Sequence, residues 1–336
     1  MVLEELVPRP VRAPDARSVH VVAVGGGTGL PRVLEGLAAG DGEPDEEPAV
    51  ELTAVVTTAD DGGSSGELRR RYGVPAPGDV RNCLVALAAG APLASVFQHR
   101  FEGGGELAGH TIGNLVLTAL AQRLGDFGQA VEAAAGMLGV RGRVVPATAT
   151  PVELVAELDD GRIVRGETAI AAARGRVAEL RLAGAAQASS QAIEAILGAD
   201  LVVLGPGSLY SSVLAGLLVP GIPEALRTTG ATRVLVVNLF TEAGETDGFD
   251  AADHVRAVQR HLGDVVDVVL AQRPPLPEDV VAAYAGEGAV PVRVERAAID
   301  AAGAVPVVTD LLAEGERGRH DPRKLARALL AIARVR

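Results

Sequence analysis

The chain has 336 residues and a formal net charge of −12, from 31 Lys and Arg against 43 Asp and Glu. Such an acidic chain is a poor general binder of nucleic acid or of anionic membranes, which are themselves negatively charged. The single lysine, Lys324, is not part of a Gly-Lys-Ser/Thr sequence, which excludes a P-loop. The single cysteine, Cys83, excludes an intramolecular disulfide and a cysteine-cluster zinc site.

Two segments bear on targeting. Residues 1–18 mix proline, charge and isolated apolar residues without the apolar core of a signal peptide, and we expect a flexible leader there. The stretch 201–223 carries no charge and is long enough to cross a bilayer, but its prolines and glycines predict strand, loop and short helix instead. We therefore expect no membrane insertion and a cytoplasmic location.

The first elements in chain order are a strand at 19–24, a glycine-rich turn at 25–29 and a helix at 30–39. A second strand at 51–57 leads into a polar loop at 59–66. The order strand, helix, strand predicts parallel neighbours joined by a right-handed crossover. Apolar residues at helical spacing then predict helices at 80–89, 92–101 and 111–124.

The pattern changes at 141–182, where apolar and polar residues alternate around Asp159-Asp160-Gly161 and predict a small antiparallel insert. Beyond it, strands are expected at 200–204, 233–238, 265–270, 290–294 and 305–308, and helices at 189–197, 222–229, 251–262 and 322–334. The predicted fold class is α/β. We expect one three-layer α/β/α domain over 19–336, with a mainly parallel Rossmann-like sheet and the antiparallel insert.

The loop at 25–29 carries the strongest chemical signal. Its four glycines let backbone N–H groups approach an anion, and the helix behind them adds a favourable partial charge. The dinucleotide fingerprint G-x-G-x-x-G is met only in part, because Leu30 stands at its third position. We predict a phosphate or diphosphate site, with NAD a compatible ligand; a glycine turn without a ligand is the alternative.

The polar loop after the second strand follows the same edge of the sheet. Asp60 and Asp61 could bind ribose hydroxyls, hold Mg²⁺ through water, act as acid and base, or cap the next turn. Gly62-x-Ser64-x-Gly66 has the sequence pattern of a nucleophile elbow, but residues 59–61 separate it from the strand that an elbow must follow directly. His110, the candidate base, has no evident acidic partner. A serine hydrolase is therefore disfavoured.

Further polar residues follow later elements. Asp79 suits a helix N-cap or a pocket, and Arg81 could make a bidentate phosphate contact. The loops 205–210 and 238–247 again place glycine and hydroxyl residues after strands. Four such loops predict one elongated phosphate- and sugar-bearing ligand along the sheet edge. The candidate ligand-binding residues are Gly25, Gly26, Gly27, Thr28, Gly29, Leu30, Thr58, Asp60, Asp61, Gly62, Ser64, Ser65, Asp79, Arg81, Asn82, His110, Asn114, Gly205, Gly207, Ser208, Tyr210, Asn238, Thr241, Glu245 and Thr246.

These motifs together resemble the gluconeogenesis-factor (YvcK-like) family, which is related to 2-phospho-L-lactate transferase. The matching pieces run in order from VVAVGGGTGLPRVLEGL through LTAVVTTADDGGSSGELRRRYGVPAPGDVRNCLVALA, FQHRF, LAGHTIGNLVLTAL, GRVVPAT, ADLVVLGPGSLYSSVLAGLLVPGI and NLFTEAGETDGFDAADHV to RHDPRKLA. The chain departs from the family pattern at Phe240, where Met is expected, and at Glu242-Ala243, where Gln-Pro is expected. Residues 273–286 have no counterpart.

The resemblance implies a cytoplasmic bacterial protein needed for cell shape and for growth on gluconeogenic carbon sources. It implies binding of a UDP-sugar, such as UDP-N-acetylglucosamine or UDP-glucose, a link to cell-wall precursors, and no established reaction or required cofactor. By motif, residues 25–29 and 205–208 would hold phosphates, and Asp60, Asp61, Asp79, Arg81 and Asn82 would line the pocket.

Three functions compete at this point. A regulator would bind a UDP-sugar without turnover and would act on a protein partner that the sequence does not identify. A Mg²⁺-dependent transferase would move a phospholactyl group from a nucleoside-diphosphate carrier to a deazaflavin. An NAD-linked oxidoreductase is disfavoured by the incomplete glycine fingerprint. A homodimer is compatible with a chain of this size.

Overall fold

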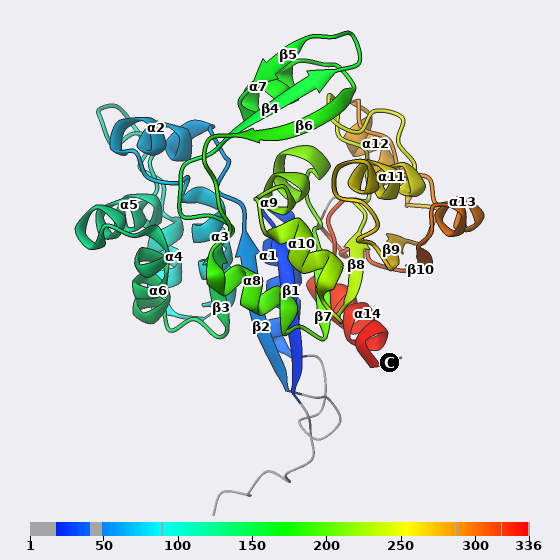
Figure 1. The fold of residues 1–336 in the computed structure, drawn as a ribbon, viewed down its shortest axis with the longest axis horizontal. Coiled ribbons are helices and arrows are strands. Elements are labelled where there is room, and N and C mark those ends of the chain that lie inside the picture. Colours follow the sequence, from blue (N-terminus) through cyan, green and yellow to red (C-terminus); the bar gives the residue numbers. More distant parts are fainter. Residues whose placement is uncertain (1–17, 41–48, 89, 287, 317, 335–336) are drawn as a thin grey trace, which may run out of the picture.

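The computed structural model describes residues 18–40, 49–88, 90–286, 288–316 and 318–334, so the predicted leader lies almost wholly outside it. A seven-stranded sheet forms the middle layer in the order β10-β9-β8-β7-β1-β2-β3 (Figure 1), and all its neighbouring strands are parallel. The strands are β1 (Val19–Gly25), β2 (Val50–Val56), β3 (Arg143–Pro146), β7 (Leu201–Leu204), β8 (Thr232–Val236), β9 (Val268–Gln272) and β10 (Val305–Thr309).

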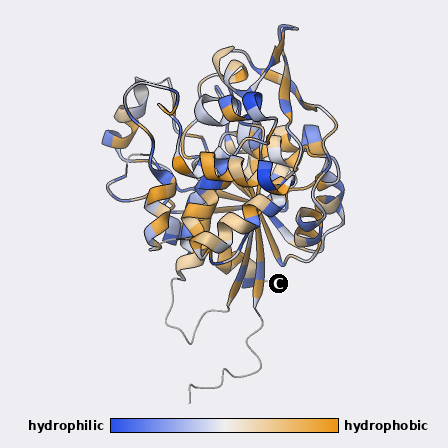
Figure 2. Cartoon of the chain, turned by 90° about the vertical axis from the view of Figure 1, so that its left-hand side faces the viewer, coloured by the Kyte–Doolittle hydropathy of each residue, from blue (hydrophilic) through white to orange (hydrophobic). Residues whose placement is uncertain are grey.

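Helices cover both faces of this sheet. Val21 and Ala23 of β1 point to one face, Val22 and Val24 point to the other, and all four are buried. The first face packs against α1 (Gly29–Ala39), α3 (Gly78–Leu87), α4 (Pro92–Gln98), α5 (Ile112–Leu124), α6 (Phe127–Leu138) and α14 (Pro322–Arg334). The second packs against α8 (Ser190–Leu197), the π-helical turn η1 (Leu209–Leu214), α9 (Ala215–Leu217), α10 (Ile222–Thr228), α11 (Ala251–Leu262) and α13 (Arg296–Ala301). Figure 2 shows the strands as mostly hydrophobic between these layers.

The order of the strands creates a crevice. From β1 the chain moves outward to β2 and β3, and it later returns to place β7 on the other side of β1. The loops that leave β1 and β7 therefore lie side by side at the carboxyl edge of the sheet and lead to helices on opposite faces. Ligands of open α/β sheets bind at such a switch point.

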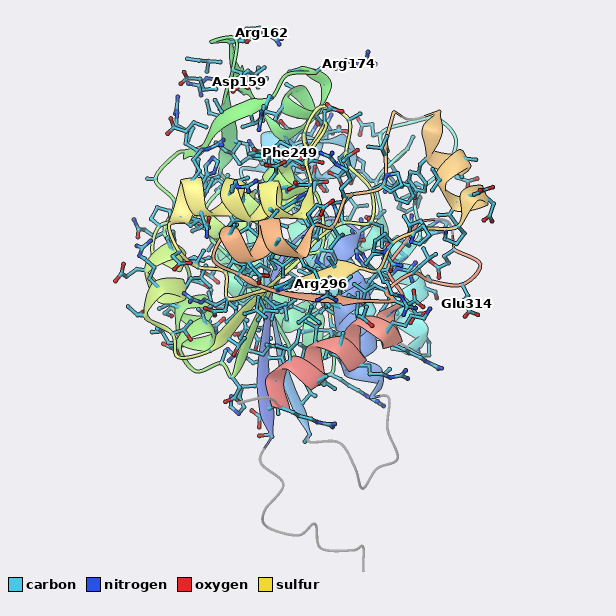
Figure 3. All side chains as sticks on the ribbon, turned by 90° about the vertical axis from the view of Figure 1, so that its right-hand side faces the viewer. Asp159, Arg162, Arg174, Phe249, Arg296 and Glu314 are labelled. Carbon is cyan, nitrogen blue, oxygen red and sulfur yellow. The ribbon has the colours of Figure 1, made fainter. Side chains whose placement is uncertain are left out.

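A second sheet lies over this edge (Figure 1). Its order is β5-β4-β6 and its pairings are antiparallel. The strands are β4 (Glu153–Leu158), β5 (Ile163–Arg165) and β6 (Val177–Ala183), with α7 (Glu167–Ala172) between the last two. Figure 3 shows Asp159 and Arg162 at the outer tip of this insert, while Phe249 lies beneath it. The guanidinium of Arg176 packs 5.3 Å from the centre of the Phe249 ring.

The α/β prediction is confirmed, and several details differ from the prediction. The predicted insert starts too early, because β3 pairs in parallel with β2 and forms an edge strand of the large sheet. The predicted strand at 290–294 was wrong: Pro291, which has no N–H, and Arg293 form only isolated bridges. The loop at 59–66 ends early, because α2 (Gly63–Tyr72) begins within it.

Among the described residues, no single helix has the length and apolar character needed to cross a membrane. One pair bent by 76°, Leu209–Leu217 with Ile222–Thr228, meets the criteria of length and composition when its halves are taken together.

Candidate functional site

The glycine loops after β1 and β7 touch backbone to backbone at the switch point. A Cβ on Gly29 would fall 2.4 Å from the carbonyl oxygen of Pro206, and a Cβ on Gly25 would fall 3.7 Å from the Cα of Gly205. Gly27 has a φ of 63°, in the left-handed region that favours glycine. The glycines predicted from the sequence are therefore needed for this close approach, which makes one continuous floor from the two loops.

A cavity of about 410 Å³ opens on this floor. Its lining includes seven of the residues predicted from the sequence, namely Gly27, Thr28, Gly29, Gly207, Ser208, Asn238 and Thr241. The N-cap of α1, Thr28, makes no side-chain capping bond, and the first turn of α1 carries no acidic residue. The first N–H groups of a helix lack partners within the helix, so this end of the cavity favours an anion.

Arg32 adds a cation on the same side of the cavity. It lies one turn into α1, and its side chain is 19% exposed. It forms ion pairs with Glu316 and, at 3.7 Å, with Glu35. A ligand phosphate would compete with these carboxylates for the guanidinium.

The cavity lining also contains an aromatic pair and a histidine. The rings of Phe240 and Tyr284 stack with centroids 4.3 Å apart and planes 15° apart. His320 is buried, and its Nε2 has no hydrogen-bond partner. Burial lowers the pKa of His320 to about 4, against an opposing backbone hydrogen bond with Val237, so the ring is neutral at pH 7. A buried ring nitrogen without a partner is suited to a polar atom of a ligand.

Asn238 joins the β7 loop to the loop that follows β8. Its side chain accepts from the N–H of Gly207 at 3.1 Å and donates to the carbonyl of Gly207 at 3.0 Å. It also donates to Glu242 Oε1 at 3.0 Å. Burial, followed by repulsion from Glu245, raises the pKa of Glu242 to about 7. This carboxyl group can therefore both donate and accept hydrogen bonds near neutral pH.

Of the 25 candidate residues, 18 lie outside the cavity lining, among them Leu30, Thr58, Tyr210, Glu245 and Thr246. Leu30 and Tyr210 are fully buried, and the Tyr210 hydroxyl reaches the carbonyl of Val177 in β6 at 3.4 Å. Glu245 accepts from the N–H groups of Tyr210 and Ser211, at 3.1 and 3.4 Å, and so caps the π-helical turn. Thr246 accepts from the N–H of Glu242 at 2.8 Å. Thr58 lies 3.5 Å from the carbonyl of Thr148. These contacts hold the loops that follow β2, β7 and β8 on the side away from the cavity lining.

The predicted acidic residues form a cluster between the first loop and the insert. Asp79 accepts a hydrogen bond from the N–H of Gly27, and burial raises the pKa of Asp79 to about 6. Burial, then the charges of Asp60 and Asp79, raise the pKa of Glu167 to about 9, so Glu167 is protonated at pH 7 and hydrogen-bonds Asp60. Asp61 accepts from the N–H and the hydroxyl of Thr168, at 2.9 and 2.7 Å. The acidic loop therefore holds α7 of the insert.

These acidic residues do not form a metal site as they stand. No group of three or more His, Cys, Asp or Glu side chains in the described part of the chain has an arrangement that could hold a metal ion. Asp60 accepts from the N–H of Gly62 at 2.8 Å. A Cβ on Gly78 would lie 2.3 Å from Ser65 Oγ and 3.1 Å from Asp60 Oδ2, so this corner is closely packed.

Arg81 lies apart from the cavity lining, inside a polar network. Its Nη1 donates to Thr111 Oγ1 at 2.7 Å and to Asn114 Oδ1 at 2.8 Å. Its Nη2 donates to Asn82 Oδ1 at 2.6 Å, whereas its buried Nε has no partner. Burial lowers the pKa of Arg81 to about 10. The phosphate contact expected of Arg81 is not formed by this packing, which instead joins α3 to α5.

The sequence analysis missed part of the cavity. Arg32, Tyr284, Arg319 and His320 line it but were not among the candidates. Arg32 and His320 lie within VVAVGGGTGLPRVLEGL and RHDPRKLA, so the quoted motifs contained a signal for both. Tyr284 lies in α12 (Glu278–Ala285), within the segment that the motifs do not cover.

The fold and the loops at its switch point define an α/β protein with a phosphate-favouring crevice. The family described as 2-phospho-L-lactate transferase CofD matches residues 21–312, and the chain belongs to this family. The chain is 43% identical over 316 residues to the gluconeogenesis factor of Halalkalibacterium halodurans, covering 93% of this chain and 95% of that protein. It is 40% identical over 317 residues to the gluconeogenesis factor of Bacillus subtilis, covering 93% and 97%. The resemblance drawn from the motifs is confirmed.

Solved structures agree with this assignment. A crystal structure of a protein from Bacillus halodurans superposes with a TM-score of 0.89 at 42% identity, covering 94% of this chain and all of that one. A second structure from that organism, described as a member of the UPF0052 family, gives a TM-score of 0.88 at 42% identity.

Proposed function

We propose that the chain is a gluconeogenesis factor that binds a UDP-sugar across the switch-point crevice and leaves it intact. The observation that carries this proposal is the cavity itself, whose lining combines the N-terminus of α1, which has no side-chain cap, with the neutral His320 and the Phe240–Tyr284 stack. A nucleoside diphosphate has the same polarity, an anion joined to a planar base.

The diphosphate belongs at the glycine floor. The N-terminus of α1 at Thr28 and Gly29 and the nearby cation of Arg32 favour negative charge there. The uracil belongs near His320, whose Nε2 is available to its polar edge, with the Phe240–Tyr284 stack alongside. Asn238, Thr241 and Glu242 are placed to meet hydroxyl groups.

The cellular role follows the relatives' name. We propose that the UDP-sugar-bound form supports growth on gluconeogenic carbon sources and cell shape through cell-wall precursor supply. It would act in the cytoplasm, on a protein partner still to be identified and as a homodimer if the chain self-associates. Neither NAD nor Mg²⁺ is required in this account.

One observation favours a second candidate. The family that matches the chain is described as a transferase of 2-phospho-L-lactate, so a Mg²⁺-dependent transfer from a nucleoside-diphosphate-linked donor is the alternative. Asp60 and Asp61 would be its acidic groups, but their oxygens already hold Gly62 and Thr168. This candidate requires the acidic loop to rearrange.

Calorimetric titration with UDP-N-acetylglucosamine, UDP-glucose, UDP, GDP and NAD, with and without Mg²⁺, separates the two. Mass spectrometry of the same samples after overnight incubation reports turnover. Saturable binding of an intact UDP-sugar without Mg²⁺ supports the regulator. Preference for GDP, or Mg²⁺-dependent conversion of a ligand, supports the transferase.

A further inference from the structure

A chain of three hydrogen bonds and one ion-pair contact runs beside α2, away from the cavity lining. Arg81 Nη1 donates to Asn114 Oδ1 at 2.8 Å, and Asn114 Nδ2 donates to Ser64 Oγ at 3.0 Å. Ser64 Oγ lies 2.9 Å from His110 Nδ1, and His110 Nε2 lies 3.4 Å from Glu67 Oε2. The chain starts at a buried cation and ends at a carboxylate whose side chain is 43% exposed.

The bonds from Arg81 and Asn114 have fixed directions, whereas the direction of the Ser64–His110 bond depends on the tautomer of His110. Because the Asn114 amide donates to Ser64 Oγ, the hydroxyl hydrogen of Ser64 can point at His110 Nδ1. This requires the tautomer of His110 with its hydrogen on Nε2, the nitrogen that lies 3.4 Å from Glu67. This is the arrangement of an activated serine: a nucleophile, a base that takes its proton, and a carboxylate that orients the base. The sequence showed no acidic partner for His110, and in the fold Glu67 takes that place.

An activated serine also needs hydrogen-bond donors for the oxyanion, and the helix that carries Ser64 supplies them. Ser64 is the second residue of α2, and the Gly62 N-cap makes no side-chain capping bond. The first N–H groups of a helix, here at Gly63, Ser64 and Ser65, lack acceptors within the helix. They are placed to stabilise an oxyanion that forms at the serine, as backbone donors do in acyl transfer.

We propose that Ser64 is the nucleophile of a second site that cleaves a small, uncharged carboxylic ester. The ester must be small because Ser64 is only 8% exposed. It must be uncharged because the loop leading into α2 carries Asp60 and Asp61, which repel an anionic substrate. The proposal is independent of the UDP-sugar crevice.

The reaction has two balanced steps. Ser64 Oγ forms a bond to the carbonyl carbon while its proton moves to His110 Nδ1, and the resulting imidazolium is stabilised by Glu67. The bond from this carbon to the leaving alkoxide oxygen breaks, and His110 returns the proton to release the alcohol. Water then attacks the acyl-serine with His110 as base, which releases the carboxylic acid and restores Ser64. Asn114 and Arg81 are positioning residues that stabilise the alkoxide.

A fluorophosphonate probe tests the nucleophile in the full-length protein, because it reacts with activated serines whatever their natural ester. Intact mass and peptide mapping of the wild type are expected to show one adduct, on Ser64, and p-nitrophenyl acetate is expected to be hydrolysed. No adduct, or an adduct on another residue, overturns the proposal. This result is obtained with the wild type and does not depend on the folding of any variant.

Variants test the base and its orienting group. His110→Gln should slow labelling by about 100-fold or more, the usual contribution of a general base. Glu67→Gln should slow labelling, because the imidazolium that forms as Ser64 reacts loses its carboxylate. The matched controls Ser95→Ala and His99→Gln, at exposed residues of neighbouring segments, should label as the wild type does. Equal labelling of folded His110→Gln and wild type overturns the relay.

Discussion

The carboxylate of Asp79 accepts a hydrogen bond from the backbone N–H of Gly27, so the first turn of α3 holds the glycine loop of β1 in place. A Cβ on the adjacent Gly26 would fall 2.4 Å from the same carboxylate. Asp79 therefore packs tightly against the glycine loop. The shape of the crevice depends on this residue, although Asp79 does not line the cavity.

Asp79 makes stability depend on pH. Burial raises its pKa from 3.8 to about 6 in the folded protein, so the folded state binds more protons than the unfolded state between those values. Asp79 therefore lowers the free energy of unfolding as pH rises from about 4 to about 6, by about 3 kcal/mol in total. Asp79→Asn should remove that part of the pH dependence, measured by urea unfolding at pH 4 and pH 8. A variant whose pH dependence matches that of the wild type would contradict the assignment.

Glu167 should control the docking of the insert at high pH. Its pKa is raised from 4.5 to about 9 by burial and by Asp60, so its stabilising contribution is complete below about pH 4.5 and falls steadily as pH rises to about 9. Hydrogen exchange of residues 163–172 should therefore quicken between pH 7 and pH 10, after correction for the intrinsic rate. Glu167→Gln keeps a donor toward Asp60 and should abolish this increase, whereas Glu167→Ala should expose the segment at pH 7. An identical response in the Gln variant and the wild type would refute the shared hydrogen bond.

Gly29→Ala should damage the crevice. Its Cβ would press on the carbonyl of Pro206 and force the two loops apart, at a cost of about 1–3 kcal/mol in unfolding free energy. Affinity for the UDP-sugar should fall at least tenfold. The control is Gly136→Ala in α6, where a Cβ meets no atom within 4 Å and the helix should gain about 0.5–1 kcal/mol. Unfolding melts and calorimetry on both variants make the comparison.

His320→Phe should separate binding from stability. It removes the unpartnered ring nitrogen of a buried residue of the cavity lining, and binding of the UDP-sugar should weaken by about 1–2 kcal/mol. Stability should hold or increase, because an unpartnered polar atom is removed. Loss of stability with unchanged affinity would place His320 in a structural role.

Arg81→Ala should act on the fold more than on the crevice. Three hydrogen bonds from its guanidinium join Asn82, Thr111 and Asn114, and their loss should cost about 3 kcal/mol. Arg81→Lys cannot make these bonds together and should recover only part of the loss. Weak UDP-sugar binding by a stable variant would restore the phosphate contact that the sequence suggested.

The glycine loops could be predicted from the sequence, whereas the residues that other segments bring to them could not. The glycines within 25–29 and 205–207 could be recognised from the sequence because two backbones that approach closely leave no room for most other residues. The central strands could be recognised because they are apolar on both faces. β3 was assigned to the insert because a four-residue strand carries too little pattern to show its partner. Neither His320 nor Glu67 could be placed, since their roles arise from chain segments that meet only in the fold.

A crystal structure of the complex with UDP-N-acetylglucosamine tests directly whether the crevice is the nucleotide site. We expect diphosphate density against the N-terminus of α1 at Thr28 and Gly29, with the uracil within hydrogen-bond distance of His320 Nε2. Density for the nucleotide at the acidic loop, or anywhere outside the crevice between the β1 and β7 loops, would contradict it.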